Sequence, residues 1–211
     1  MSQPKDVEAF VRLIADTAVE NEKYFSELDG VVGDGDFGIS LATGFSKVLA
    51  EWDNLDHSSP GAFLKKVSTT IVGSVGGVTG TIWGTAFLRA GMVLGTKSTT
   101  EIHPEDVIAM FRSAIEGMKK RGDSDLGDKT LLDALIPAVD RLEQSFKEGK
   151  DPTSAVTDAA VIARKQAEDT RPMIAKRGRA SYTGERSIGT LDAGAVAIAV
   201  IFEKISEAMR A

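Results

Sequence analysis

The segment Asp29-Gly-Val-Val-Gly33-Asp34-Gly35-Asp36-Phe37-Gly38-Ile39-Ser40 interrupts a strong helical pattern. Apolar residues recur at helical spacing before it, from Val7 to Leu28, and after it, from Ile39 to Trp52. Glycine and aspartate are poor helix formers. The segment is therefore predicted to be a loop that joins two amphipathic helices.

The same alternation of helix and polar connection continues along the chain. Six further helices are expected, and no run alternates as hairpin strands do. They are predicted over Ser59–Val67, Gly77–Met92, Pro104–Met118, Thr130–Phe146 with a kink near Pro137, Asp151–Ala167 and Ala193–Met209. The sequence thus predicts an all-α fold in which eight antiparallel helices form an up-and-down bundle or barrel.

Four glycine-rich or polar connections carry most of the unusual composition. They cover residues 29–40, 73–80, 122–130 and 177–194. In an up-and-down arrangement these alternate connections emerge at the same end of the bundle. The pattern therefore predicts that four separated motifs build one site.

Composition limits the kind of protein. The chain has 211 residues, expected to form a single domain over 1–211, and a formal net charge of −6 without a Lys/Arg stripe, which argues against nucleic acid as partner. It has no cysteine, which excludes disulfides and Cys-based metal sites. Residues 1–6 lack the features of a signal peptide, and no apolar run reaches membrane-spanning length. A cytoplasmic location without membrane contact is expected.

The first connection combines acids with glycines. Asp29, Asp34 and Asp36 would repel one another, whereas glycine lets backbone N–H groups approach an anion. A divalent cation bound between the carboxylates and a phosphate would explain why acids and glycines occur together, so we predict a Mg-nucleotide site. The alternative is a solvated turn rich in Asp and Gly. An EF-hand fits poorly, because Phe45 falls where a bidentate Glu is needed.

The other connections also admit two interpretations. Thr79-Gly80 opens a helix and can hold phosphate, or the small residues there serve helix packing. The 122–130 connection does not have the spacing of a P-loop. Gly33-x-Gly35-x-x-Gly38 follows a helix rather than a strand, so it is not a Rossmann dinucleotide motif. The 177–194 segment is predicted to be a long irregular loop whose arginines clamp phosphate or adenine.

Taken together, the motifs resemble the nucleotide-binding L subunit of dihydroxyacetone kinases. The resemblance covers essentially the whole chain, and the motifs occur in the family order. They are Leu28-Asp29…Val32-Gly33-Asp34-Gly35-Asp36-x-Gly38, Gly76-Gly77-Val78-Thr79-Gly80-x-x-Trp83-Gly84, Gly127-Asp128-Lys129-Thr130-x-x-Asp133 and Gly178-Arg179-x-Ser181-Tyr182-x-Gly184-Glu185-Arg186-Ser187-x-Gly189-x-x-Asp192-x-Gly194.

The resemblance implies a helical barrel that holds ATP or ADP at one end. It implies two Mg²⁺ ions on Asp29, Asp34 and Asp36, the acids that would carry the catalysis. It assigns phosphate and nucleotide contacts to Phe37, Gly38, Ile39, Ser40, Thr79, Gly80, Gly122, Leu131, Arg179, Asp192, Ala193 and Gly194. Many relatives have His where this chain has Phe37, which leaves a polar contact at that position open.

The implied activity is transfer of a phosphoryl group from the nucleotide to dihydroxyacetone or a related keto-sugar held by a separate K subunit. Two alternatives stay open. The nucleotide is instead an ADP cofactor that a phosphotransferase-system phosphocarrier rephosphorylates, or the chain is a nucleotide-dependent regulatory module.

Overall fold

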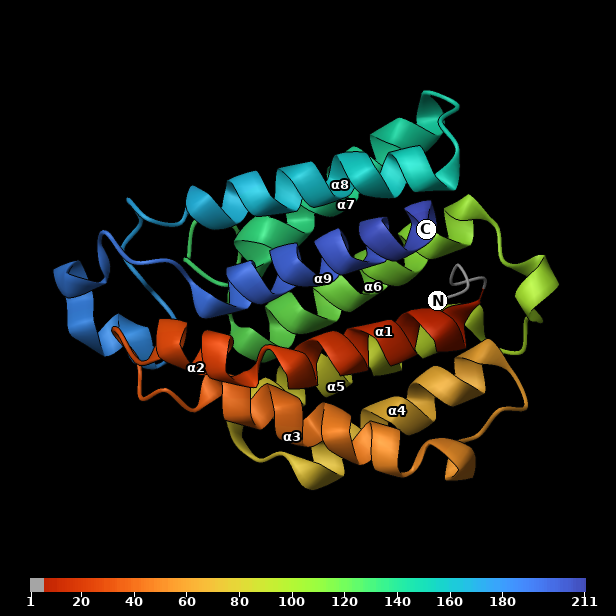
Figure 1. Ribbon diagram of the computed structural model, residues 1–211, viewed down its shortest axis with the longest axis horizontal. Helices are drawn as coiled ribbons and strands as arrows, with labels where there is room; N and C mark the ends of the chain where they lie inside the picture. The colour runs from red at the N-terminus through yellow and green to blue at the C-terminus, as the bar shows by residue number, and fades with distance from the viewer. Residues whose placement is uncertain (1–5) are drawn as a thin grey trace.

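The computed structural model describes residues 6–211, and over this range all regular secondary structure is helical, without a β-strand (Figure 1). The predicted all-α class is confirmed. The α-helices are α1 (Val7–Glu20), α2 (Glu22–Asp29), α3 (Phe37–Ala50), α4 (Pro60–Ser74), α5 (Gly77–Leu94), α6 (Pro104–Gly122), α7 (Leu131–Lys147), α8 (Pro152–Glu168) and α9 (Ala193–Arg210). Three 3₁₀ segments are η1 (Trp52–Asn54), η2 (Thr99–Glu101) and η3 (Arg179–Ser187). The expectation that residues 1–6 lack a signal peptide concerns mainly residues 1–5, which lie outside the described range.

Helices that follow one another in the chain pack side by side, and α9 closes the ring against α1 and α2. The predicted up-and-down helical barrel is confirmed. The α2–α3, α4–α5, α6–α7 and α8–α9 connections gather at one end, at the left of Figure 1, whereas the start of α1 and the end of α9 lie toward the other end. The glycine-rich connections therefore share one end of the molecule, as predicted.

One expected helix is divided in two. The pattern from Val7 to Leu28 predicts a continuous helix, but α1 ends before Asn21 and α2 begins after it. The backbone N–H and the Nδ2 of Asn21 both donate to O of Thr17, at 3.2 and 2.8 Å. Asparagine side chains that bond nearby backbone groups compete with helix continuation. The break lets α2 turn its last residue, Asp29, toward the loop.

The helix starts follow their capping residues. Ser59, Thr130 and Asp151 each accept a hydrogen bond from a backbone N–H of the first turn, at 3.2, 3.2 and 3.0 Å. The expected starts of α4, α7 and α8 are thereby confirmed. Helix α7 continues through Pro137 to Lys147.

Helix α9 forms the centre of the fold. Its first ten residues, Ala193–Phe202, are all buried, because α9 packs against α1, α2, α7 and α8. A helix that is apolar on every face belongs inside a protein. No helix within residues 6–211 has the length and apolar character needed to cross a membrane. The burial of α9 places its N-terminus among the glycine-rich connections.

Candidate functional site

The three predicted metal-binding acids lie together. Asp29 ends α2, Asp34 lies in the following loop, and Asp36 directly precedes α3. One carboxylate oxygen of each lies within 4.8 Å of the others. At 4–5 Å, two such charges repel by about 3–4 kcal/mol at an effective dielectric near 20. The repulsion between these carboxylates favours a positive charge among them.

Glycines make this close approach possible. The N–H of Gly33 donates to O of Asp29 at 2.6 Å, and a Cβ at Gly33 would lie 2.3 Å from Oδ1 of Asp29. Gly35 has φ +76°, a conformation that other residues rarely adopt. The alternation of Gly and Asp thus turns the chain back on itself over the end of α2.

The donor set fits a hard divalent cation. The cluster offers carboxylate oxygens from three residues, and Mg²⁺ and Ca²⁺ prefer oxygen ligands. Asp29 is partly buried and is oriented by the N–H of Phe37, 3.4 Å from its Oδ2, while Asp34 and Asp36 are exposed. One side of the cluster is therefore held by the protein and the other is open to a ligand.

Arg179 lies on this acid cluster. Its Nη1 contacts Oδ2 of Asp34, and its Nη2 lies 3.3 Å from Oδ2 of Asp36. The segment that carries Arg179 was expected to be irregular, but residues 179–187 form the 3₁₀ turns of η3, interrupted at Gly184 with φ +57°. Hydroxyls of Ser181 and Thr183 bond carbonyls three residues back and stabilise these turns.

Two helix N-termini at this end begin without a side-chain cap. Helix α3 follows Asp36 and helix α5 follows Gly76, and neither residue makes a capping hydrogen bond. By contrast, Asp6, Ser59, Thr130, Asp151 and Asp192 cap α1, α4, α7, α8 and α9. Uncapped first-turn N–H groups and the helix dipole favour an anion. The predicted residues Phe37–Ser40, Thr79 and Gly80 lie in these two first turns.

The ring of Phe37 belongs to the core. It packs at 6.2 Å from the ring of Phe25, so its backbone rather than its side chain faces the acids. Gly38 is buried, because a Cβ there would lie 2.1 Å from O of Glu22. Ile39 is 53% exposed. The side chain of Phe37 therefore packs on the core and stabilises the first turn of α3.

The remaining predicted residues surround the starts of α7 and α9. Gly122 ends α6 and lies against Ile82 of α5. Leu131 begins α7 and packs on Gly194, where a Cβ would lie 3.0 Å from the Cβ of Leu131. Ala193 and Gly194 are buried in the first turn of α9. The structure thus places all the predicted residues at one end of the barrel. Among them, Arg179 contacts the acids and Leu131 contacts Gly194.

Asp192 caps α9, with its Oδ1 accepting from the N–H of Ala195 at 2.7 Å. Burial raises the pKa of Asp192 to about 7, and the nearby carboxylates of Asp133 and Asp29 act in the same direction. The N–H of Ala195 and the charge of Lys129 act in the opposite direction and lower the pKa of Asp192.

Two residues of the quoted motifs, Asp133 and Lys129, were given no role by the sequence analysis. Asp133 is buried and accepts hydrogen bonds from the N–H groups of Gly127 at 2.6 Å and Thr130 at 2.7 Å. The pattern Thr-x-x-Asp, a variant of the capping box, was the signal that could have found it. Lys129 is buried as well, and a lysine in a polar loop gives no sequence signal for burial.

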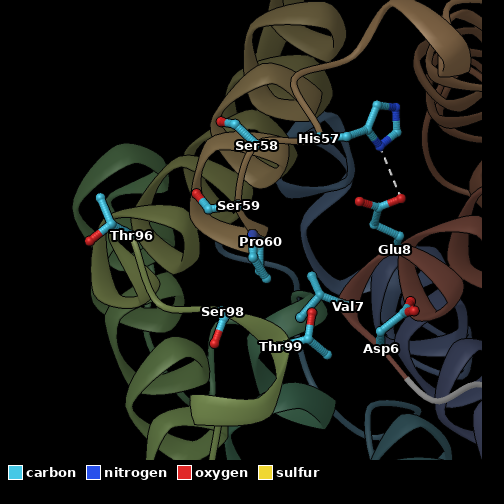
Figure 2. Close-up of a pocket in the computed structure, with 10 residues that line it drawn as sticks. All are labelled: Asp6, Val7, Glu8, His57, Ser58, Ser59, Pro60, Thr96, Ser98 and Thr99. Atoms are coloured by element: carbon cyan, nitrogen blue, oxygen red, sulfur yellow. Dashed lines mark hydrogen bonds and ion pairs between the residues drawn. The ribbon is translucent and has the colours of Figure 1, made fainter.

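The opposite end of the barrel holds a cavity of about 340 Å³ (Figure 2). It is lined by the starts of α1 and α4 and by the connection after α5, including Glu8, His57, Ser59 and Thr96. None of the predicted nucleotide-site residues lies there.

Comparison with known proteins identifies the family of the chain. The model of the DAK2 domain matches residues 31–207, and the chain belongs to this family. It is 36% identical over 188 residues to the "PEP-dependent dihydroxyacetone kinase, ADP-binding subunit DhaL" of Escherichia coli, covering 89% of each chain. It is 34% identical to the "PTS-dependent dihydroxyacetone kinase, ADP-binding subunit DhaL" of Lactococcus lactis, covering 89% of this chain and 88% of the relative. The resemblance seen in the motifs, to a kinase family, is confirmed.

A solved structure shows the same fold. The dihydroxyacetone kinase of C. freundii, in complex with AMP-PNP and Mg²⁺, superimposes with a TM-score of 0.73 at 24% identity. The alignment covers 98% of this chain and 35% of that one.

Proposed function

We propose that this chain is the nucleotide-binding subunit of a dihydroxyacetone or related keto-sugar kinase. The observation that carries the proposal is the acid cluster of Asp29, Asp34 and Asp36 beside two uncapped helix N-termini. The E. coli and L. lactis relatives, named as ADP-binding subunits, support it.

In this proposal, the three acids hold two Mg²⁺ ions, which when bound neutralise charge on the phosphate oxygens. First-turn N–H groups of α3 and α5 donate to the phosphates, near Ser40 and Thr79. Residues around Gly122, Leu131 and Asp192–Gly194 receive the rest of the nucleotide. Phosphoryl transfer depends mainly on such positioning and charge stabilisation, which the chain supplies without a nucleophile of its own.

The acceptor sugar is proposed to be held by a separate K subunit. Neither histidine of the chain is placed to hold a sugar beside the acid cluster, because His57 lies at the far cavity and His103 directly precedes α6. The rim of the acid end instead exposes apolar side chains: Val31 at 64%, Val78 at 67% and Tyr182 at 88%. These side chains are available to contact a partner subunit that docks on this end.

The test is turnover of Mg-ATP with dihydroxyacetone or erythrulose, with and without a cognate K protein. Activity is expected only with the partner, and it should vanish in Asp36→Asn. Robust turnover by the isolated chain would contradict the division of the site between two subunits.

A second candidate has specific support, because the relatives are named PEP- or PTS-dependent. In that case ADP stays bound and a phosphocarrier rephosphorylates it. ADP retained through purification, with slow exchange for ATP, selects this candidate. Rapid ATP exchange and turnover select the first, and nucleotide binding without turnover under either donor selects a regulatory module.

A further inference from the structure

Lys129 makes an unusual set of contacts for a lysine in a loop. Its side chain is buried, and its Nζ donates to O of Ser187 at 2.5 Å, O of Thr190 at 2.8 Å and O of Met173 at 3.2 Å, with Oγ1 of Thr190 at 3.3 Å. An ammonium group has three N–H donors and no acceptor. All its partners belong to residues 173–190, which we call the strap.

These bonds close the base of the strap. Met173 lies at its start, and Ser187 and Thr190 lie at its end, so one ammonium group joins the two. The hydroxyl of Ser187 also accepts from the N–H of Ala175 at 2.9 Å, across the same base. The N–H of Lys176 donates to O of Asp128 at 3.1 Å, next to Lys129 in the chain.

The middle of the strap is held differently. Ser181 bonds O of Gly178 at 2.6 Å and Thr183 bonds O of Ala180 at 2.7 Å, both within the strap itself. Outside the strap, Arg177 contacts O of Asp123 at the protein surface, and Arg179 contacts the acid cluster through Asp34 and Asp36. The place of the Arg179 guanidinium therefore depends on the closed base together with the exposed contact of Arg177.

Stability alone accounts poorly for a lysine at this position. Its ammonium group is bonded to neutral oxygens rather than to a carboxylate, and burial lowers the pKa of Lys129. Its backbone also has φ +61°, in the left-handed region that favours glycine. Residues kept in such conformations concentrate at functional sites.

We propose that Lys129 is a positioning residue: by closing the base of the strap it holds Arg179 over the acid cluster. The inference rests on the proposed function, because the reaction that Arg179 would serve is nucleotide-dependent phosphoryl transfer. Lys129 acts through Arg179 and touches neither nucleotide nor sugar.

The first test measures the strap without any nucleotide. Trypsin cleaves after Lys176, Arg177, Arg179 and Arg186 when the strap opens, and cleavage of a transiently open segment follows its opening free energy. Lys129→Met is expected to speed this cleavage about tenfold or more, the effect of about 1.4 kcal/mol. Lys165→Met is the matched control, because Lys165 lies on α8 outside the strap, is 63% exposed and pairs with Asp169 at 2.5 Å; it should change cleavage less than about twofold. Equal cleavage of the Lys129 variant and wild type would overturn the proposal.

The second test asks whether Lys129 acts through Arg179. Affinity for Mg-ADP is measured by calorimetry in wild type, Lys129→Met, Arg179→Ala and the double variant. The Lys129 substitution is expected to weaken binding about tenfold in wild type, but less than about twofold when Arg179 is already absent. Equal losses in both backgrounds would mean that Lys129 is merely structural.

The two proposals fail in different ways. A wild-type chain that binds no Mg-ADP overturns the proposed function and the inference together. Normal Mg-ADP binding by wild type, with an unchanged strap in Lys129→Met, overturns the inference alone. If the Met variant does not fold, Lys129→Gln carries the same measurements, since its amide keeps two donors without the charge.

Discussion

Nη2 of Arg179 lies 3.3 Å from Oδ2 of Asp36, while Nη1 of the same guanidinium contacts Asp34. The positively charged guanidinium of Arg179 therefore lies among the carboxylates that are proposed to bind metal. Its charge offsets their mutual repulsion. The guanidinium and a bound metal ion would compete for the same oxygens.

Arg179→Ala is expected to have opposite effects on two ligands. Affinity for Mg²⁺ alone should rise about two- to fivefold, because an exposed ion pair worth about 0.2–1 kcal/mol no longer competes. Affinity for Mg-ADP should fall, by about 1.5–3 kcal/mol, because a charge-assisted contact is lost. Both are measured by calorimetry, with Arg210→Ala, at the opposite end of α9, as control. Changes of the same sign for both ligands would refute this competition.

Asp34→Asn should weaken Mg-ADP binding at least about tenfold, or 1.4 kcal/mol. The midpoint of thermal unfolding of the ligand-free chain should change little, because the lost repulsion and the lost pair with Arg179 offset each other. Asp123→Asn is the control, since Asp123 is an exposed acid of the α6–α7 connection whose φ of +47° asparagine tolerates. Unchanged Mg-ADP affinity in Asp34→Asn would remove the metal proposal.

Gly38→Ala and Gly61→Ala form a matched pair. A Cβ at Gly38 would lie 2.1 Å from O of Glu22, and one at Gly61 would lie 2.2 Å from O of Gly95. Both substitutions should lower the free energy of unfolding by about 1–3 kcal/mol through overpacking. Gly38 lies in the first turn of α3 and Gly61 at the far end, so Gly38→Ala alone should also weaken Mg-ADP binding. Urea unfolding and calorimetry below the unfolding transition separate the two effects; equal affinity losses would contradict the assignment of α3.

His57 should make stability depend on pH. Its Nδ1 lies 3.0 Å from Oε2 of Glu8 (Figure 2). Its Nε2 lies 2.9 Å from O of Trp52, so only the imidazolium donates to both. The hydrogen bond with Glu8 raises the pKa of His57 above its usual value. A raised pKa means that the stabilisation is fully present below about pH 6.5 and is lost as pH rises through the folded-state pKa.

The size of this effect is limited, because the side chains of His57 and Glu8 are each 37% exposed. We expect a loss of less than about 1 kcal/mol between pH 5.5 and 8.5. Urea unfolding across this range, in wild type, His57→Gln and Glu8→Gln, measures it. Both variants should show a flatter profile than wild type; an identical slope in His57→Gln would assign the dependence to other groups.

Much of the fold follows from local patterns. The starts of α4, α7 and α8 are set by Ser59, Thr130 and Asp151, whose side chains bond their own first turns. The break at Asn21 was not predicted, because the apolar spacing runs through it and only the competition for O of Thr17 decides the outcome. The order inside residues 179–187 was missed as well, since short 3₁₀ turns leave no apolar period.

The sequence by itself determined the helical class, the starts of α4, α7 and α8, and the acid cluster, because each depends on residues close together in the chain. Asp29 and Asp36 are separated by only a few residues, and the glycines between them bend the chain. Only the tertiary structure decided that Arg179 lies on those acids and that Lys129 closes the strap. Both contacts join segments distant in sequence, and they exist because the packing of consecutive antiparallel helices brings alternate connections to one end. A charged residue in a polar loop looks the same in sequence whether it ends in solvent or among buried carbonyls.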